Sequence, residues 1–134
     1  MGSNKKLQNC CKMFRTLEMK IWDNGDCTRM KIPLFGGFIL NIKTMLVQQG
    51  KKSRIYVSDD GYVVEYYKVT LKDIDILCKK YNLEYMLNRD GGYTLNCEIY
   101  KVVDEESFCN AVYDIIDLAV EVVRSTKRRE YHGA

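Results

Sequence analysis

Residues 93–125, which decide the fold, read YTLNCEIYKVVDEESFCNAVYDIIDLAVEVVRS. Apolar and polar residues alternate over residues 93–102, and this alternation predicts a β-strand. From Asp104 the apolar residues recur at steps of three and four, which predicts a helix running to about Ser125. We expect Asp104 to cap this helix, because acidic side chains favour its positive N-terminal end. The apolar face of the strand consists of Leu95, Cys97 and Ile99, and that of the helix of Phe108, Ala111, Val112, Ile115, Leu118, Ala119 and Val122.

The segment before this stretch predicts a second, shorter helix followed by a hairpin. The helix is expected to begin at Thr70, whose hydroxyl is placed to cap the amide of Asp73. It is expected to end at Asn82, since asparagine tolerates the left-handed conformation of a helix end. Residues 84–88 then predict a strand, and the turn residues 89–92 lead the chain back into the next strand.

The middle of the chain predicts strands that are joined by tight turns. Residues 27–34 alternate weakly and contain a proline, which places this strand at an end or an edge, and residues 38–48 form the longest predicted strand. Residues 54–58 form a shorter one. The turn at residues 59–61 contains an Asp-Gly pair, which tolerates the positive φ of a type I′ turn. We therefore expect residues 62–67 to continue the hairpin as a strand.

The N-terminal part predicts a helix over residues 5–21, because its apolar residues draw one stripe. Its last part, residues 18–22, also fits a strand. These elements define an α+β fold: an antiparallel sheet of about five strands with three helices, and with the long C-terminal helix packed on one face. We expect a single domain over residues 1–134 with a flexible tail from about residue 126.

The composition is that of an ordinary globular protein and disfavours the common catalytic devices. The chain has 134 residues and a net charge of +3, a length that allows one domain. Its single histidine, His132, lies in the predicted tail, whereas a catalytic triad needs a histidine beside its nucleophile. No glycine-rich phosphate loop is present. We therefore expect a protein without a cofactor that is not an enzyme.

The cysteines and the apolar segments indicate a cytoplasmic protein. The six cysteines contain no C-x-x-C pair, so the common zinc and redox motifs are missing from the sequence. The N-terminus lacks the apolar stretch of a secretory signal, and nothing approaches the length of a membrane span. We expect reduced thiols, no metal and no membrane partner.

Three stretches of the chain resemble a family of small bacterial and phage domains of unknown function. They are KIPLF at residues 31–35, VSDDGY at residues 57–62, and the helix–hairpin–helix pattern over residues 70–125. The resemblance, which covers about residues 5–125, implies the same order of elements, with a Ser-Asp-Asp-Gly turn and a long C-terminal helix. It also implies a prokaryotic or phage source among mobile-element genes, and it implies no reaction. Gly36, Gly37 and Phe38 stand where the family often has a polar or acidic cluster.

Ten tyrosines are the most unusual feature of the composition. Tyrosine combines a large apolar face with a hydroxyl and suits protein interfaces. We predict a small protein-binding domain that docks through its sheet and one edge strand onto another protein, with a second copy of the chain as one such partner. The resemblance adds a specific form, an inhibitor of a host defence protein such as a nuclease. The predicted partner-binding residues are Tyr62, Tyr66, Tyr67 and Tyr100.

Two alternatives stay open at this point. A nucleic-acid-binding protein would use the basic residues near the C-terminus and in one loop, because phosphate binding scales with such charges. These residues are Arg124, Lys127, Arg128, Arg129, Lys51 and Lys52. A metal-dependent nuclease would instead gather the carboxylates of Asp59, Asp60 and Glu65 around a divalent ion.

Overall fold

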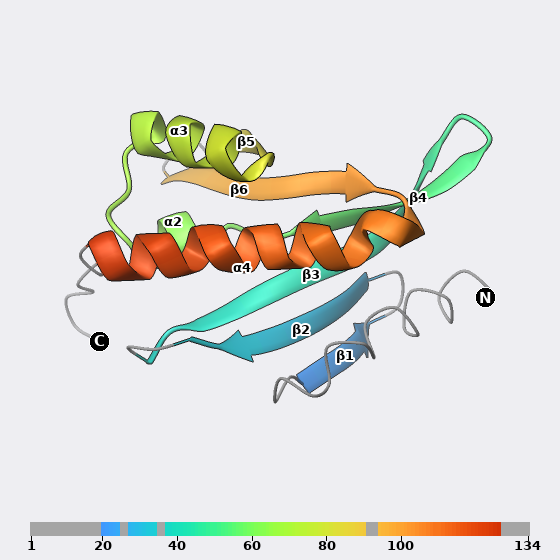
Figure 1. Ribbon diagram of the computed structural model, residues 1–134, viewed down its shortest axis with the longest axis horizontal. Helices are drawn as coiled ribbons and strands as arrows, with labels where there is room; N and C mark the ends of the chain where they lie inside the picture. Colours follow the sequence, from blue (N-terminus) through green and yellow to red (C-terminus); the bar gives the residue numbers. More distant parts are fainter. Residues whose placement is uncertain (1–19, 25–26, 35–36, 91–93, 127–134) are drawn as a thin grey trace.

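An antiparallel sheet with helices packed on one face forms the fold (Figure 1). The structure, a computed structural model, describes the backbone of residues 20–24, 27–34, 37–90 and 94–126 and the side chains of residues 28–34, 37–87 and 97–126. Its elements are β1 (Lys20–Asn24), β2 (Cys27–Pro33), β3 (Ile39–Gln49), β4 (Lys52–Ser58), α2 (Tyr62–Tyr66), α3 (Leu71–Tyr81), β5 (Glu84–Asp90), β6 (Thr94–Val103), the 3-10 helix η3 (Glu105–Ser107) and α4 (Phe108–Ser125).

The strand order of the sheet is β1-β2-β3-β4-β6-β5, and every neighbouring pair is antiparallel. The first four strands follow the chain, whereas β6 pairs with both β4 and β5. The α+β class and the antiparallel sheet predicted from the sequence are confirmed. The sheet holds six strands rather than about five, because residues 20–24 form β1.

The long helix α4 crosses the sheet and closes the core, as its apolar stripe predicted (Figure 1). Every residue of that stripe is at most 1% exposed, and α4 contacts β3, β4 and β6. The predicted cap is wrong, because the Asp104 side chain caps neither η3 nor α4. Its Oδ1 instead accepts a hydrogen bond of 3.1 Å from Nε of Arg54 on β4.

The shorter helix α3 forms as its two end residues predicted. Oγ1 of Thr70 accepts a hydrogen bond of 3.1 Å from the backbone N–H of Asp73, and Asn82 ends the helix with φ 57°. Near its C-terminus α3 is joined to α4, since Glu121 accepts hydrogen bonds from Lys80 and Tyr81. The two helices therefore cover one face of the sheet together.

Replacing Thr70 with alanine is expected to lower the free energy of unfolding by about 1 kcal/mol, because the N–H of Asp73 loses its acceptor at the helix start. Urea unfolding of the wild type and the variant measures the difference. Thr70→Ser keeps the hydroxyl and is expected to stay near the wild-type value. Equal stabilities of all three proteins would show that this cap contributes nothing.

The core-facing residues of the sheet follow the predicted alternation. In β3, Leu40 and Ile42 are buried, and Phe38 just before the strand is 2% exposed. In β6, Cys97 and Ile99 are both fully buried. Pro33 ends β2, as expected for a residue that cannot donate to the ladder. The register thus places one apolar face of the sheet under the helices.

One predicted strand is wrong, since residues 62–67 do not continue a hairpin. Asp60 and Gly61 do adopt positive φ, 56° and 79°, as the turn prediction required. The chain then leaves the sheet and forms the short helix α2, which contacts β3 and β6. The physical reason is the side chain of Asp59, whose contacts are described below.

Two predictions at the chain ends are only partly covered by the described residues. The predicted N-terminal helix lies outside them up to residue 19, while Lys20 and Ile21, which it included, belong to β1. The alternative of a strand at residues 18–22 is therefore confirmed for its described part. The predicted tail from about residue 126 lies outside them from residue 127, and α4 ends at Ser125.

Helices long and apolar enough to cross a membrane do not occur among the described residues. The three cysteines whose side chains are described, Cys78, Cys97 and Cys109, are free thiols. Cys78 and Cys97 are buried and Cys109 is partly buried.

Candidate protein-binding surface

The face of the sheet opposite α4 carries the side chains that alternate with the core residues. Neither α3 nor α4 lies on this side, because both pack against the core face. Because α3 and α4, the long helices of the described residues, lie on the other side, we call it the helix-free face and define it by residues of the five strands β2 to β6. They are Arg29, Lys31, Asn41, Lys43, Met45, Tyr56, Ser58, Glu84, Met86, Glu98, Tyr100 and Val102.

Two stacked tyrosines occupy the centre of the helix-free face. The rings of Tyr56 on β4 and Tyr100 on β6 have centroids 5.4 Å apart and planes inclined by 25°. Met45 lies opposite Tyr56 on one side and Val102 on the other, so the centre is apolar. All four side chains are half-buried. A rigid aromatic pair with apolar neighbours is the usual composition of an interface centre.

Charges on the helix-free face are divided between its two halves. Arg29, Lys31 and Lys43 lie on β2 and β3, whereas Glu84 and Glu98 lie on β5 and β6. The carboxylate of Asp60, from the turn after β4, lies 3.6 Å from Arg29 and 3.6 Å from Lys43. This acid offsets one of the three cations, and the β2–β3 half stays positive. The opposite half is negative.

The predicted partner-binding tyrosines do not share one surface. Tyr100 belongs to the helix-free face, but β6 lies between β4 and β5 and is no edge strand. Tyr62 and Tyr66 stack on one another on α2, with centroids 5.7 Å apart. The expectation that these tyrosines lie on one edge strand is therefore wrong, because residues 62–66 are helical and β6 is an internal strand.

Tyr67 lies in the core and is not placed to contact a partner. It is 3% exposed and packs edge-on against Phe38, with ring centroids 5.1 Å apart. The predicted strand over residues 62–67 does not form here, because the chain is helical up to Tyr66. Burial of Tyr67 helps to anchor α2 on the sheet.

Asp59 directly follows β4 and lies three residues before the start of α2. Its backbone N–H donates to the carbonyl of Ile99 on β6 at 2.9 Å, and its Oδ1 accepts from the N–H of Ile99 at 2.9 Å. The same carboxylate accepts from the N–H of Gly61 at 2.9 Å and of Val63 at 3.1 Å. The Asp59 side chain thus accepts from the N–H of β6 that loses its backbone acceptor at the end of β4. It also accepts from backbone N–H groups at the start of α2.

Burial sets the protonation of the groups around this turn. Asp59 is fully buried, and burial raises its pKa to about 6 although three backbone N–H groups oppose the rise. Burial also raises the pKa of Cys78 to about 12 and that of Cys97 to about 11, with further contributions that include the charge of Asp59. These two cysteines are neutral thiols at pH 7 and lack the thiolate that nucleophilic catalysis needs.

The three carboxylates of the nuclease alternative do not converge. Asp59 is engaged by backbone amides, Asp60 lies beside Arg29 and Lys43, and Glu65 is exposed on α2. Among the described side chains no group of three or more histidine, cysteine or acidic residues is placed to hold a metal ion. A two-metal or one-metal hydrolytic site needs such a cluster.

The two basic clusters of the nucleic-acid alternative lie at opposite ends of the molecule where they are described. Lys51 lies in the β3–β4 turn, Lys52 is the first residue of β4, and Arg124 lies in the last turn of α4 (Figure 1). Lys127, Arg128 and Arg129 lie outside the described residues. The described cations therefore do not form one continuous track for a phosphate backbone.

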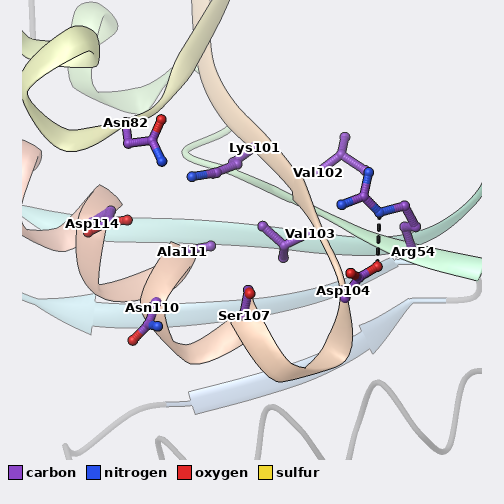
Figure 2. Close-up of a pocket in the computed structure, with 10 residues that line it drawn as sticks. All are labelled: Arg54, Asn82, Lys101, Val102, Val103, Asp104, Ser107, Asn110, Ala111 and Asp114. Atoms are coloured by element: carbon purple, nitrogen blue, oxygen red, sulfur yellow. Dashed lines mark hydrogen bonds and ion pairs between the residues drawn. The ribbon is translucent and has the colours of Figure 1, made fainter.

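A polar cleft of about 380 Å³ lies on the helix side, between the end of α3, β6 and the start of α4. Figure 2 shows Lys101 extending from β6 toward Asn82 and Asp114, with the Arg54–Asp104 pair at the other end. Burial raises the pKa of Asp114, and the charge of Lys101 opposes the rise. The cleft mixes both charges with amides.

Sequence reasoning missed the partners that make up the centre of the helix-free face. Tyr56 was not selected, although it alternates with the apolar Ile55 and Val57 in the strand 54–58. That alternation places Tyr56 on the face away from the core, which was a usable signal. Its stacking on Tyr100 depends on the pairing of β4 with β6, strands separated by more than thirty residues of chain.

Comparisons with known proteins identify no relative of this chain. No protein-family model matches the chain, and no curated protein and no solved structure shows significant similarity to it.

Proposed function

We propose that the chain is a small protein-binding domain whose contact surface is the helix-free face. The observation that carries this proposal is the stacked pair Tyr56 and Tyr100 at the centre of a sheet face that neither α3 nor α4 covers. Aromatic side chains of this kind lose little conformational entropy on binding and supply much of the energy of protein interfaces.

The surroundings of the tyrosine pair support the same function. The apolar neighbours Met45 and Val102 allow a partner to exclude water from the centre, and charges on both sides allow it to select orientation. A catalytic role has less support among the described residues, since both oxygens of the buried Asp59 already accept hydrogen bonds from backbone N–H groups.

Replacing both Tyr56 and Tyr100 with alanine is expected to abolish partner capture while the protein stays folded. Loss of two aromatic anchors at an interface centre weakens binding by roughly a hundredfold or more. The measurement is affinity capture from a lysate of the source cells with the wild type and the double variant as bait, followed by quantitative mass spectrometry. Circular dichroism checks that both baits are folded.

Tyr113→Ala provides the matched control, because Tyr113 is 46% exposed on α4, on the opposite side of the molecule. Proteins that the wild type and the Tyr113 variant retain, and that the double variant loses, are expected. Equal recovery by all three baits would remove the helix-free face as the contact surface.

A narrower form of the proposal concerns the partner of a bacterial or phage domain. The resemblance of residues 31–35 and 57–62 to such domains supports an inhibitor that covers a surface of a host defence protein, such as a nuclease. Inhibition of the nuclease by the wild type, but not by the Tyr56 and Tyr100 double variant, is the outcome that supports it.

A further inference from the structure

The distribution of charge on the helix-free face makes this surface complementary to itself. The cations Arg29 and Lys31 lie on β2, near one side, and the acids Glu84 and Glu98 lie on β5 and β6, near the other. Opposite charges on opposite halves of one patch are what an isologous interface needs, because the same patch serves on both subunits.

The strand order defines how two copies would face one another. A two-fold axis parallel to the strands and passing over β4 places β3 of one copy over β6 of the other, and β2 over β5. Residues that share a row of the register then meet across the interface. Arg29 faces Glu84, Asn41 faces Glu98, Lys43 faces Tyr100, Met45 faces Val102, and Tyr56 faces its own counterpart, while Lys31 faces Met86.

Three of these meetings join complementary side chains. Arg29 and Glu84 form an ion pair, Lys43 lies over an aromatic ring, and Met45 meets the apolar Val102. Twisted sheets that pack face to face keep their strands within about 30° of each other, so the central rows stay in register. Because of the two-fold symmetry, each contact away from the axis occurs twice, once on each side of the axis.

We propose that the helix-free face binds a second copy of the same chain as a two-fold symmetric dimer. The proposal rests on the proposed function, since it names the partner of that same surface. The five strands lie about 4.8 Å apart and about six residues of each contribute, which gives a footprint of roughly 400 Å² on each copy. A patch of this size belongs to weak, reversible interfaces, and the dissociation constant is expected in the micromolar range.

Sedimentation velocity of the full chain tests the dimer at concentrations from about 1 to about 200 µM. The wild type is expected to change from monomer to dimer across this range. Glu84→Lys combined with Glu98→Lys makes the whole face positive and is expected to weaken the dimer at least about tenfold. Arg29→Glu combined with Asn41→Glu makes the β2–β3 half negative, leaves the contact between Asp60 and Lys43 intact, and is expected to have the same effect.

Mixing the two charge variants provides the decisive measurement. In the mixture each positive half meets a negative half of the other variant, so a heterodimer is expected at concentrations at which each variant alone is mostly monomeric. The control combines Glu106→Lys with Asp117→Lys, which changes the net charge by the same amount as Glu84→Lys with Glu98→Lys but on the helix side, where both residues are exposed. This control variant is expected to dimerise like the wild type.

Three results would each overturn the proposal: a wild type that stays monomeric throughout, a dimer that neither charge variant weakens, or two charge variants that fail to associate when mixed. Failure here does not remove the proposed function. A face that still captures another protein through Tyr56 and Tyr100 would have a different partner, whereas a face that captures nothing would fail both tests.

Discussion

Replacing Asp59 with alanine is expected to lower the free energy of unfolding by about 3 to 9 kcal/mol. The substitution leaves three buried N–H groups, those of Gly61, Val63 and Ile99, without the carboxylate that now accepts from them. Each buried donor without a partner costs about 1–3 kcal/mol. Domains of this size are stable by only about 5–15 kcal/mol, so the variant is expected to be close to unfolding. Urea unfolding followed by circular dichroism measures the change.

Two further variants make the interpretation of this result specific. Asp59→Asn keeps one oxygen for Gly61 and Ile99 but turns an amide N–H toward Val63, and we expect an intermediate loss of stability. Asp60→Asn tolerates the positive φ of the turn and removes only partly exposed ion pairs, worth at most about 1 kcal/mol. If Asp59→Ala were no more damaging than Asp60→Asn, the role given to the carboxylate of Asp59 would be wrong.

The stability of the protein is expected to increase on mild acidification because of the same residue. Burial raises the pKa of Asp59 from its ordinary value of 3.8 to about 6. Between these two values the folded chain keeps a proton that the unfolded chain releases, so the free energy of unfolding falls as pH rises. The contribution is fully present below the unfolded pKa and is lost as pH passes about 6. It amounts to about 3 kcal/mol over the whole range.

Comparison with Asp59→Asn separates this effect from the titration of the other carboxylates. Between about pH 7 and about pH 4.5 the wild type is expected to gain about 2 kcal/mol relative to the variant, which cannot titrate at this position. The measurement is urea unfolding of both proteins at a series of pH values. A difference that stays constant, or that changes with the opposite sign, would contradict a raised pKa for Asp59.

The described part of the fold was predictable wherever the signal acts within a few residues. The stripe from Phe108 to Val122 defines α4, because its repeat matches the helical turn and every member is buried. Thr70 and Asn82 set the ends of α3 through their own conformations. The alternation in β3 and β6 identified their core-facing residues, since a strand turns successive side chains to opposite faces.

The candidate site was predictable only in part, because its residues come from strands that are distant in the chain. Tyr100 was selected from the sequence, whereas its stacking partner Tyr56 depends on β4 pairing with β6. The tyrosines of residues 62–67 were assigned to a strand, and tertiary contacts between Asp59 and Ile99 made that segment helical up to Tyr66 instead.

Local patterns in the amino-acid sequence were sufficient to predict the α+β class, the long amphipathic helix, the faces of its strands and the positive φ of the Asp60–Gly61 turn. These follow from the period of apolar residues and from conformational preferences of single residues, which operate locally. Three features depend on the tertiary structure: the strand order, the point near Asp59 where the chain leaves the sheet, and which face of the sheet α3 and α4 do not cover. Those outcomes depend on hydrogen bonds and packing between segments tens of residues apart, whose energies no local pattern contains.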